Sequence, residues 1–464
     1  MNVVSEDTRL AIAKIEQLIG ERITTNATVC DHHGHDESWH ESMAPDAVCF
    51  AQSVEEVRHI AATCHEYHVP LIPYGTGTGM AGQVVAEHGG ICLDLSQMNK
   101  ITQVNTDDFD CTVQAGVTRN QLNEHLRATG LFFSVDPGAD ASIGGMAATR
   151  ASGTNTVRYG TMRDNVISLT VVLADGRVIR TAGRARKSAA GYDLTGLFVG
   201  SEGTMGIIVE VCVKLHGVPE AISAASLCFD TIDNAVDAVI ATLHCNIPMA
   251  RIELLDEAQI RAINRYSKTE FEEKPTLFIE FHGSDASVAE QAQAFGEICS
   301  EFNSSSFDWT TNTEQRSQMW SARHNAAYAA AAYIPGHRAI ATDVCVPISR
   351  LAECIRETRR DIEQSCTLTT MLAGHVGDGN FHQVFLLDPN SETDFEQFKS
   401  LYARLIQRAI DMDGTCSGEH GIGIGKRDFM IDEFGEATIE VMTALKWALD
   451  PTGIMNPGKK LPSQ

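Results

Sequence analysis

Two short clusters near the C-terminal end of the chain gather side chains that could do chemistry. One is HVGDGNFH, from His375 to His382, and the other is SGEHGIGIGK, which contains Glu419 and His420. Neutral imidazole and carboxylate are ligands that divalent cations such as Zn²⁺ and Mn²⁺ accept, so His375, His382 and Glu419 predict a metal site. His420 is a candidate general base. Because glycine-rich polar loops build no core, we interpret the clusters as a metal-assisted reaction centre, either hydrolytic or redox.

The segment between the two histidines has to bring them together. Gly377 and Gly379 predict an extended or turning backbone, in which His375 and His382 can converge. The alternative is that these are ordinary buried or surface histidines, which would be the better interpretation of either one alone.

Length and composition bound the class of protein. A chain of 464 residues predicts two or three domains. The 36 basic and 61 acidic residues give a formal charge of −25, which argues against nucleic acid as a partner and against general affinity for anionic lipid. An anionic substrate would need a locally placed Arg or Lys.

The sequence predicts a cytoplasmic protein, with peripheral contact to a membrane left open. No window approaches the roughly 18 consecutive apolar residues of a membrane-spanning helix, and the start resembles neither a secretory signal nor an Arg-rich transit peptide. The 13 cysteines include no CxxC pair, so no iron–sulfur cluster or zinc ribbon is encoded, and we expect reduced core thiols.

The first 45 residues are expected to form a helical segment, with Ala11, Ile12, Ile15, Leu18 and Ile19 on one face. The polar run DHHGHDESWH that follows matches no metal-ligand spacing, and we expect a surface segment there.

A regular α/β pattern begins at Ala47, with a helix capped by a Ser53–Glu56 capping box and then the strand LIPY. The loop PYGTGTGMAG follows directly, and the N–H groups and hydroxyls of such a loop can cradle a phosphate. A tight connection between strands is the alternative, because the strand ICLDLS comes next instead of the helix of a Rossmann unit. The candidate ligand-binding residues of this loop are Pro73, Gly75, Thr76, Gly77, Thr78 and Gly79.

A long run of small residues, DPGADASIGGMAATRASGTNTVRYG, comes after a helix capped by Thr118 and the strand LFFSV. Small residues serve where backbone lies against a flat or extended ligand, and the apolar ones indicate burial instead of a flexible loop. The candidates are Asp136, Pro137, Gly138, Ser142, Gly144, Gly145, Ser152, Gly153 and Thr154. A hairpin with the turn ADG and a second glycine-rich turn, at residues 200–206, lead into a further strand.

The segments PYGTGTG, DPGADASIGGMAAT and GSEGTMGIIVEV, in this order and spacing, resemble the FAD-binding domain of the vanillyl-alcohol oxidase superfamily, the PCMH-type fold. The resemblance implies an α+β protein whose FAD-binding domain has two α+β subdomains. It places the loop of residues 75–79 on the pyrophosphate, and Gly203, Gly206 and Ile208 near the adenosine side. The loop has neither the His nor the Cys that attaches flavin covalently in some members, so we expect non-covalent FAD.

The composition changes near Pro219, where we place a domain boundary. Beyond it, strands and helices predict an α+β substrate (cap) domain. An Ala-rich helix expected over residues 319–333 carries Arg323, whose guanidinium could grip a carboxylate bidentately; a solvated helix charge is the alternative. The strand TTMLAGHVGDG delivers His375, and a C-terminal helix with Ile439, Met442, Leu445 and Leu449 ends at Asp450.

We therefore divide the chain into four parts. They are an N-terminal helical segment (1–45), the FAD-binding domain (46–219), the substrate domain with the metal-site strand (220–415) and a C-terminal segment that completes the active site (416–464).

The motifs WSARHNAAYAA, ATDVCVPISRL, AGHVGDGNFH, GTCSGEHGIGIGKR and LDPTGIMNPGKKL resemble the FAD-dependent D-2-hydroxyacid dehydrogenases, above all the cytochrome-linked D-lactate branch. The resemblance spans nearly the whole chain. It implies His375, His382 and Glu419 as metal ligands, His420 as catalytic base and Arg323 as the anchor of the substrate carboxylate. Asn380 also matches a site position, and the tail, returning to the flavin domain, would bring Asn456 near the isoalloxazine.

The expected activity is FAD- and metal-dependent oxidation of a D-2-hydroxy acid, D-lactate to pyruvate, with hydride passing from C2 to flavin N5. The stretch GHRAIATDVCVP has Arg338 but no Lys before Asp343, which favours a monocarboxylate over D-2-hydroxyglutarate. A glycolate-oxidase-type FAD subunit shares the motifs and stays open. A redox-neutral flavin transferase would not need HVGDGNFH with SGEH.

The cofactors and partners follow from the same motifs. Two His and one Glu suit Zn²⁺ or Mn²⁺ equally. The chain has no haem CxxCH, so the reduced flavin needs an external acceptor, either a cytochrome, a quinone, an electron-transfer flavoprotein or oxygen. A homodimer is left open.

Overall fold

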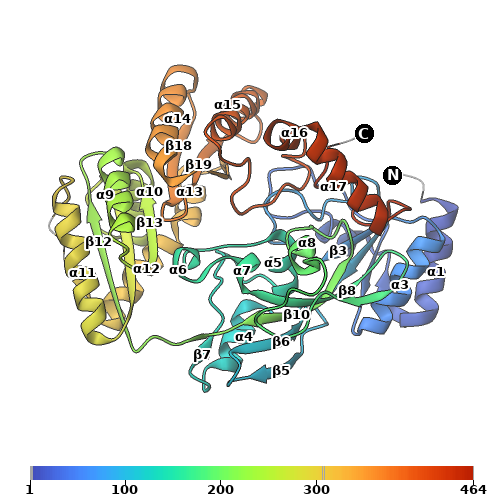
Figure 1. The fold of residues 1–464 in the computed structure, drawn as a ribbon. Helices are drawn as coiled ribbons and strands as arrows, with labels where there is room; N and C mark the ends of the chain where they lie inside the picture. Colours follow the sequence, from blue (N-terminus) through green and yellow to red (C-terminus); the bar gives the residue numbers. More distant parts are fainter. Residues whose placement is uncertain (1–3, 306, 308, 463–464) are drawn as a thin grey trace. The chain divides into compact units, whose positions relative to one another are not determined.

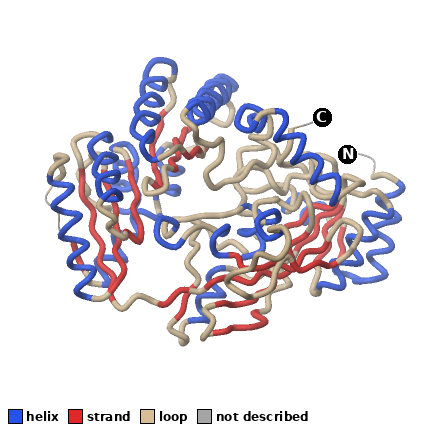
Figure 2. Tube along the Cα trace, viewed as in Figure 1, coloured by secondary structure: helices blue, strands red, loops and turns tan. Residues whose placement is uncertain are grey.

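The computed structural model describes residues 4–305, 307 and 309–462. Within them the chain forms two compact units: unit 1 comprises residues 4–152, 160–218 and 419–462, and unit 2 comprises residues 153–159 and 219–418. Both units pack helices on β-sheets, as Figure 1 shows along the chain and Figure 2 by secondary structure. The expected α+β class is confirmed.

The first sheet of unit 1 has the order β1-β2-β4-β3, in which β2 and β3 run parallel to β4. Its strands are β1 (Ile23–Thr24), β2 (Ala47–Phe50), β3 (Leu71–Tyr74) and β4 (Ile91–Asp94). Helices α1 (Glu6–Ile19) and α3 (Val54–Glu66) pack on each other over an apolar core. The buried stripe of α1 runs through Ala11, Ile15 and Ile19, which leaves Leu18 on its edge and 43% exposed.

The start of α3 differs in one detail from the predicted capping box. Ser53 Oγ does accept the Glu56 N–H at 3.3 Å. The Glu56 carboxylate, however, binds the Arg22 guanidinium at 2.7 Å and the Gln52 N–H at 2.8 Å. The guanidinium of Arg22 holds both oxygens of Glu56 in a bidentate pair, which turns the carboxylate away from the Ser53 N–H.

The run DHHGHDESWH, expected on the surface, is partly buried. It starts in α2 (Ala27–His32) and continues as a loop. The ring of His33 bonds Asp94 at 2.9 Å, and the Asp36 carboxylate accepts the Gln83 N–H at 3.0 Å, with His33 and Asp36 both buried. The surface prediction is wrong here because these partners offset the cost of burying polar groups.

The second sheet of unit 1 is antiparallel, in the order β5-β6-β10-β8-β9. Its strands are β5 (Ile101–Asn105), β6 (Asp110–Gln114), β8 (Val166–Val172), β9 (Val178–Arg180) and β10 (Ile207–Lys214). Helix α4 (Arg119–Leu126) begins with the reciprocal box of Thr118 and Gln121, and α5 (Ile143–Thr149) packs on β6 and β10. The expected strand LFFSV is only β7 (Leu131–Phe132), paired with β11 (His216–Gly217). Short helices α7 (Met162–Asn165) and α8 (Leu194–Phe198) complete this part.

Unit 2 is built on one antiparallel sheet in the order β15-β12-β14-β13-β18-β19-β16, with β17 also on β19. The strands are β12 (Ala221–Cys228), β13 (Met249–Leu255), β14 (Thr276–Gly283), β15 (Trp309–Thr310), β16 (Arg338–Ala341), β17 (Val344–Cys345), β18 (Thr369–His375) and β19 (Asn380–Leu387). Two phenylalanines of β14, three positions apart, point to opposite faces of the sheet. Phe281 contacts Phe295 of one helix layer, and Phe278 lies in a cluster with Trp320 of the other.

The helices of unit 2 cover both faces of this sheet (Figure 1). The layer on the Phe281 side includes α9 (Ile232–His244), α11 (Asp285–Ser300) and α14 (Leu351–Ser365), with α15 (Glu392–Asp411) against α14. The layer on the Phe278 side includes α10 (Glu257–Ser267), α12 (Thr313–His324) and α13 (Ala326–Tyr333), and α6 (Thr156–Tyr159) contacts β13.

The Ala-rich helix expected over residues 319–333 is in fact two helices, α12 and α13, which meet at Asn325. Side chains of these helices and of α10 fix the break: Asn325 Nδ2 donates to Ser267 Oγ at 3.3 Å, and Gln259 Nε2 donates to the Ala326 carbonyl at 3.0 Å. Tertiary contacts therefore override the helix propensity of the alanines. As a consequence, Arg323 lies in the last turn of α12.

The C-terminal segment, α16 (Phe429–Phe434) and α17 (Glu436–Leu449), belongs to unit 1, as expected for a tail that returns to the flavin domain. After α17 the chain pairs with β3: the Leu71 N–H donates to Ile454 at 2.8 Å, and the Asn456 N–H donates to Leu71 at 3.0 Å. The apolar side of α17 is only partly covered, with Leu445 exposed. Among the described helices, none combines the length and apolar character needed to cross a membrane.

Candidate active site

The three glycine-rich segments meet in unit 1. A Cβ on Gly75 would lie 2.5 Å from Ser142 Oγ, so the first segment packs tightly on the second. A Cβ on Gly203 would lie 3.0 Å from Pro73 Cγ, so the third segment packs on the first. Side chains at Gly75 and Gly203 would push the three segments apart. Glycine at these two positions therefore allows the segments to pack together.

The first segment presents unused hydrogen-bond donors. Within the described residues, the backbone N–H groups of residues 76–80 donate no hydrogen bond. The hydroxyls of Thr76 and Thr78 lie 3.0 Å apart, and Gly77 adopts φ +69°. Successive N–H groups around a left-handed residue form the kind of concave nest that binds anions, which fits the diphosphate of FAD.

Asn456 offers a second fit to a flavin. The side chain is buried, and its Nδ2 donates to the carbonyls of Gln83 at 2.9 Å and Glu202 at 2.8 Å. Its Oδ1 is buried with no hydrogen-bond partner among the described residues. A buried acceptor without a donor is costly, and the N–H of an isoalloxazine ring would satisfy it.

The other predicted flavin residues have mixed surroundings. Gly144 lets α5 approach Ala115, Gly206 lies against Val171, and Ile208 is part of the hydrophobic core, so each has a packing role in the structure. Asp136, Pro137, Gly138, Gly145 and Ser152 belong to unit 1, whereas Gly153 and Thr154 belong to unit 2.

The cluster that begins at Glu419 is anchored on the glycine-rich segments of unit 1. The Glu202 carboxylate, buried in the GSEG turn, accepts the N–H groups of Ile422 at 2.8 Å and Gly423 at 2.7 Å. Gln83 Nε2 donates to the carbonyl of His420 at 2.7 Å. Neither the Glu202 contact nor the Gln83 contact was predicted from the sequence. The one available signal was a Glu inside a glycine-rich turn, whose carboxylate can accept backbone N–H groups.

The side chains of Glu419 and His420 are largely buried. Ser152 Oγ donates to Glu419 Oε2 at 2.6 Å, and Glu419 Oε1 lies 3.7 Å from His420 Nε2. A carboxylate beside an imidazole stabilises its protonated form, which suits a residue that takes up a proton.

His375 and His382 converge in unit 2, as predicted. Strands β18 and β19 form a hairpin in which His375 pairs with Asn380 and Ala373 with His382, so the two histidines share one face. Their rings meet edge to face with centroids 5.5 Å apart. His375 Nδ1 bonds the Glu253 carboxylate at 2.7 Å, and His382 Nδ1 bonds the Thr342 carbonyl at 2.9 Å.

These bonds determine which ring nitrogen can bind a metal. An acceptor at Nδ1 keeps the proton there and puts the lone pair of each neutral ring on Nε2. Metal-ligating histidines almost always donate their other N–H to a carboxylate or a carbonyl. The surroundings of His375 and His382 are therefore compatible with a role as metal ligands, although His33 and His282 make similar bonds elsewhere in the protein.

Arg323 is not a solvated helix charge, which corrects the alternative left open above. Its side chain is 11% exposed, and its Nη2 donates to Glu253 Oε2 at 2.5 Å. Its Nε is buried and has no hydrogen-bond partner in the described part of the chain, so it can serve an incoming carboxylate. Burial alone would raise the pKa of Glu253, but His375 and Arg323 outweigh it and hold that pKa below its usual value.

Asn380 lies in the same part of unit 2. Its Nδ2 donates to Asp343 at 2.8 Å and to the Val344 carbonyl at 2.7 Å. Ser417 donates to the other oxygen of Asp343 at 2.9 Å. The buried Asn380 Oδ1 meets no hydrogen-bond donor among the residues that the structure describes, which leaves an acceptor for a ligand.

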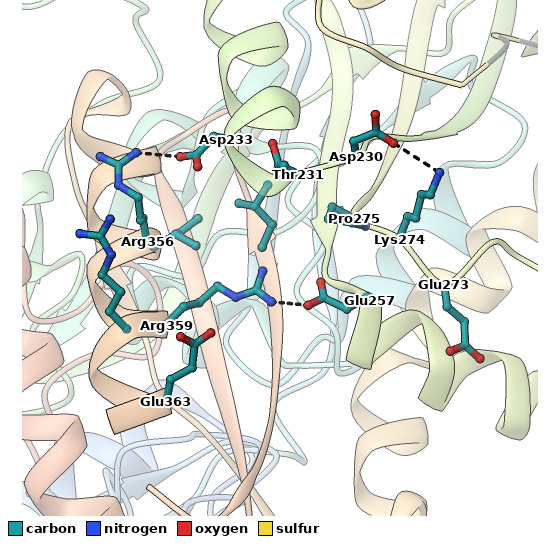
Figure 3. Close-up of a pocket in the computed structure, with 13 residues that line it drawn as sticks. Asp230, Thr231, Asp233, Glu257, Glu273, Lys274, Pro275, Arg356, Arg359 and Glu363 are labelled. Atoms are coloured by element: carbon teal, nitrogen blue, oxygen red, sulfur yellow. Dashed lines mark hydrogen bonds and ion pairs between the residues drawn. The ribbon is translucent and has the colours of Figure 1, made fainter. Parts of the chain in front are cut away.

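A pocket of about 440 Å³ elsewhere in unit 2 is not this site (Figure 3). Its charges are largely paired within or beside it: Arg356 binds Asp233 at 3.0 Å, Arg359 binds Glu257, and Lys274 binds Asp230 at 3.4 Å. Its described lining includes none of the predicted site residues. The size of a cavity therefore does not locate the chemistry in this protein.

Comparisons with known proteins identify the family of the chain. A family model described as the FAD binding domain matches residues 45–182, and one described as the C-terminal domain of FAD linked oxidases matches residues 218–460. The chain therefore belongs to the family of FAD-linked oxidases and is an FAD-dependent oxidoreductase.

Within that family the chain is similar to proteins named D-lactate dehydrogenases. It is 52% identical, over 95% of its length and 89% of the relative, to a probable mitochondrial D-lactate dehydrogenase of Danio rerio. It is 45% identical, over 97% of its length and 80% of the relative, to the mitochondrial D-lactate dehydrogenase [cytochrome] of Arabidopsis thaliana. The resemblance inferred from the motifs is confirmed.

A solved structure shows the same fold. The crystal structure of p-cresol methylhydroxylase with substrate bound superposes with a TM-score of 0.82 over 99% of this chain and 97% of that one, at 18% identity. The PCMH-type fold expected from the three glycine-rich segments is thereby confirmed.

Proposed function

We propose that the protein oxidises D-lactate to pyruvate with bound FAD and a divalent metal ion. The observation that carries the proposal is the pair His375 and His382, whose Nδ1 atoms both bond acceptors. The acceptor of His375 is the buried Glu253 carboxylate, which also binds Arg323. The names of the relatives support D-lactate as the substrate.

The residues of the chain have distinct tasks in this reaction. Arg323 binds the substrate carboxylate through donors that include the buried Nε, and so orients C2. His420 takes the hydroxyl proton on a ring nitrogen, and the nearby Glu419 carboxylate stabilises the resulting charge. The nest at residues 76–80 and Asn456 hold the flavin. FAD, when bound, accepts the hydride from C2.

His375, His382 and Glu419 are the proposed metal ligands, and two imidazoles with one carboxylate suit Zn²⁺ or Mn²⁺. A divalent ion held by them would act as a Lewis acid that lowers the pKa of the substrate hydroxyl. His420 would then remove a proton from a stronger acid.

The position of Arg338 bears on whether the substrate has one carboxylate or two. Arg338, the candidate for a second carboxylate, pairs with Leu387 of β19, whereas Ala341 pairs with Val384. Five residues along β19 separate Leu387 from His382, which is roughly 16 Å at about 3.3 Å per residue. That spacing favours a monocarboxylate such as D-lactate over D-2-hydroxyglutarate.

Anaerobic mixing of the purified protein with a panel of D- and L-2-hydroxy acids tests the proposal. D-lactate should bleach the visible flavin absorbance and L-lactate should not. The His420→Ala variant should keep FAD and metal but reduce its flavin about 10²–10⁴-fold more slowly. Near-normal bleaching by that variant would contradict the role of His420, and bleaching by glycolate in preference to D-lactate would favour a glycolate-oxidase-type subunit.

We further propose that a cytochrome, a quinone or an electron-transfer flavoprotein reoxidises the flavin. Of these, a cytochrome agrees with the name of the Arabidopsis relative. Steady-state turnover with each acceptor distinguishes them.

For the division of the chain we propose the four parts 1–45, 46–219, 220–415 and 416–464. All 13 cysteines are free thiols, which suits a reducing compartment. We propose the cytoplasm, with peripheral membrane contact; two relatives are named mitochondrial, and cell fractionation decides between these locations. Light scattering tests the homodimer.

A further inference from the structure

Glu253 is a buried carboxylate of unit 2 that accepts a hydrogen bond from a predicted metal ligand on one oxygen and from the predicted substrate anchor on the other. It lies on β13, and its side chain is 1% exposed. Its Oε1 accepts from His375 Nδ1 at 2.7 Å, and its Oε2 accepts from Arg323 Nη2 at 2.5 Å. Each oxygen therefore holds a residue with a different task in the proposed reaction.

The sheet topology explains this arrangement. Strand β13 lies between β14 and β18, and its Leu254 pairs with Gly374, which puts Glu253 beside His375 at the end of β18. On β14, Phe278 pairs with Glu253 and packs with Trp320 of α12, so Glu253 faces the helix layer that carries Arg323. No local sequence pattern links these three residues.

We infer that Glu253 is a positioning residue that aligns the metal ligand His375 and the substrate anchor Arg323 through one rigid carboxylate. By accepting the Nδ1 proton it holds the tautomer of His375 that coordinates through Nε2, and it raises the basicity of that ring. By accepting from Nη2 it directs the remaining guanidinium donors, including the buried Nε. The inference rests on the proposed function.

The competing explanation is a buried ion pair that serves only the fold. The same sheet face offers a comparison, because Glu280 on β14 is also buried, accepts from His282 at 2.7 Å and lies 3.7 Å from Arg251. Both glutamates thus hold one His and one Arg. Of the two glutamates, only Glu253 has partners that are predicted to contact metal and substrate. Comparing substitutions of Glu253 and Glu280 therefore distinguishes a positioning role from a purely structural one.

The experiment compares Glu253→Gln with Glu280→Gln in the full-length flavoprotein. Calorimetric titration of metal-free protein with Zn²⁺ and Mn²⁺ measures metal affinity, steady-state kinetics gives KM and kcat for D-lactate, and thermal unfolding measures stability. Glu253→Gln should weaken metal binding about 10- to 100-fold and raise KM for D-lactate about tenfold or more, since Arg323 loses its alignment. Glu280→Gln should lower the unfolding temperature and leave metal affinity and KM within about twofold.

Glu253→Asp covers the case in which the Gln variant does not fold. Aspartate keeps the charge but withdraws the carboxylate by one methylene, about 1.5 Å, so metal affinity and KM should shift in the same direction with little loss of stability. Unchanged metal affinity and KM in a folded Glu253 variant, or equal shifts in Glu280→Gln, would overturn the inference alone. A wild-type protein that binds neither metal would overturn the proposed metal site and this inference together.

Discussion

Replacing Glu202 with Gln tests whether one buried carboxylate holds the backbone next to the proposed base. Glu202 is 4% exposed, and its two oxygens accept the N–H groups of Ile422 at 2.8 Å and Gly423 at 2.7 Å. Lys460 Nζ lies 3.3 Å from one of them. Glutamine keeps one acceptor and turns an NH₂ group toward the other N–H, so one bond is lost and two donors face each other.

The expected loss can be estimated from these contacts. A hydrogen bond to a charged group contributes about 1.5–3 kcal/mol, and a buried N–H without an acceptor costs about 1–3 kcal/mol. Because these two figures overlap in part, we expect Glu202→Gln to lower the unfolding free energy by about 2–4 kcal/mol. Because Ile422 follows His420 by two residues, the base should shift, and a displacement near 1 Å can cost about 10²-fold in rate. The contacts of the Glu202 backbone are unchanged, so FAD should be retained.

Denaturant unfolding and single-turnover flavin reduction by D-lactate measure the two effects. Glu210→Gln is the matched control, because Glu210 is a half-buried carboxylate of unit 1 whose Oε2 accepts from Thr170 Oγ1 at 3.0 Å. It should cost about 1 kcal/mol or less and leave the reduction rate unchanged. A Glu202→Gln protein with wild-type stability within about 0.5 kcal/mol and a wild-type reduction rate would refute the reasoning.

Two further predictions concern a glycine and a buried acid. Gly423→Ala should lower FAD occupancy, because its Cβ would overlap the carbonyl oxygen of Ala81 in the loop of residues 73–82. Gly435→Ala, at φ +76° and ψ 158° in open space, strains the backbone without any overlap and should keep FAD, as flavin absorbance per protein will show. Burial raises the pKa of Asp256 from 3.8 to about 7, so the native state holds a proton that the unfolded state has lost, and stability falls as pH rises from about 4 to 7. Asp256→Asn removes this pH dependence, so the variant should be more stable than wild type at pH 8 by up to about 4 kcal/mol, with no gain near pH 4. Denaturant unfolding over this pH range measures the difference, and parallel pH profiles of stability for the two proteins would contradict the buried-acid explanation.

Several local features of this protein were predictable from its sequence. The cap of α4, strand β3 and the convergence of His375 with His382 all arise within short segments. Their backbone preferences are local, since a cap needs one side chain and one N–H three residues away. The identity of the candidate metal ligands was likewise readable from residue type and spacing.

The partners of the buried charges were decided only by the tertiary structure. Glu253 meets His375 across 122 positions of the chain because β13 and β18 are neighbours in the sheet, and Glu202 reaches Ile422 across 220 positions. The break at Asn325 follows in the same way from contacts with α10. Strand order and helix packing bring such groups together, and because burial makes an unpaired charge costly, the fold that pairs them also decides what each one does.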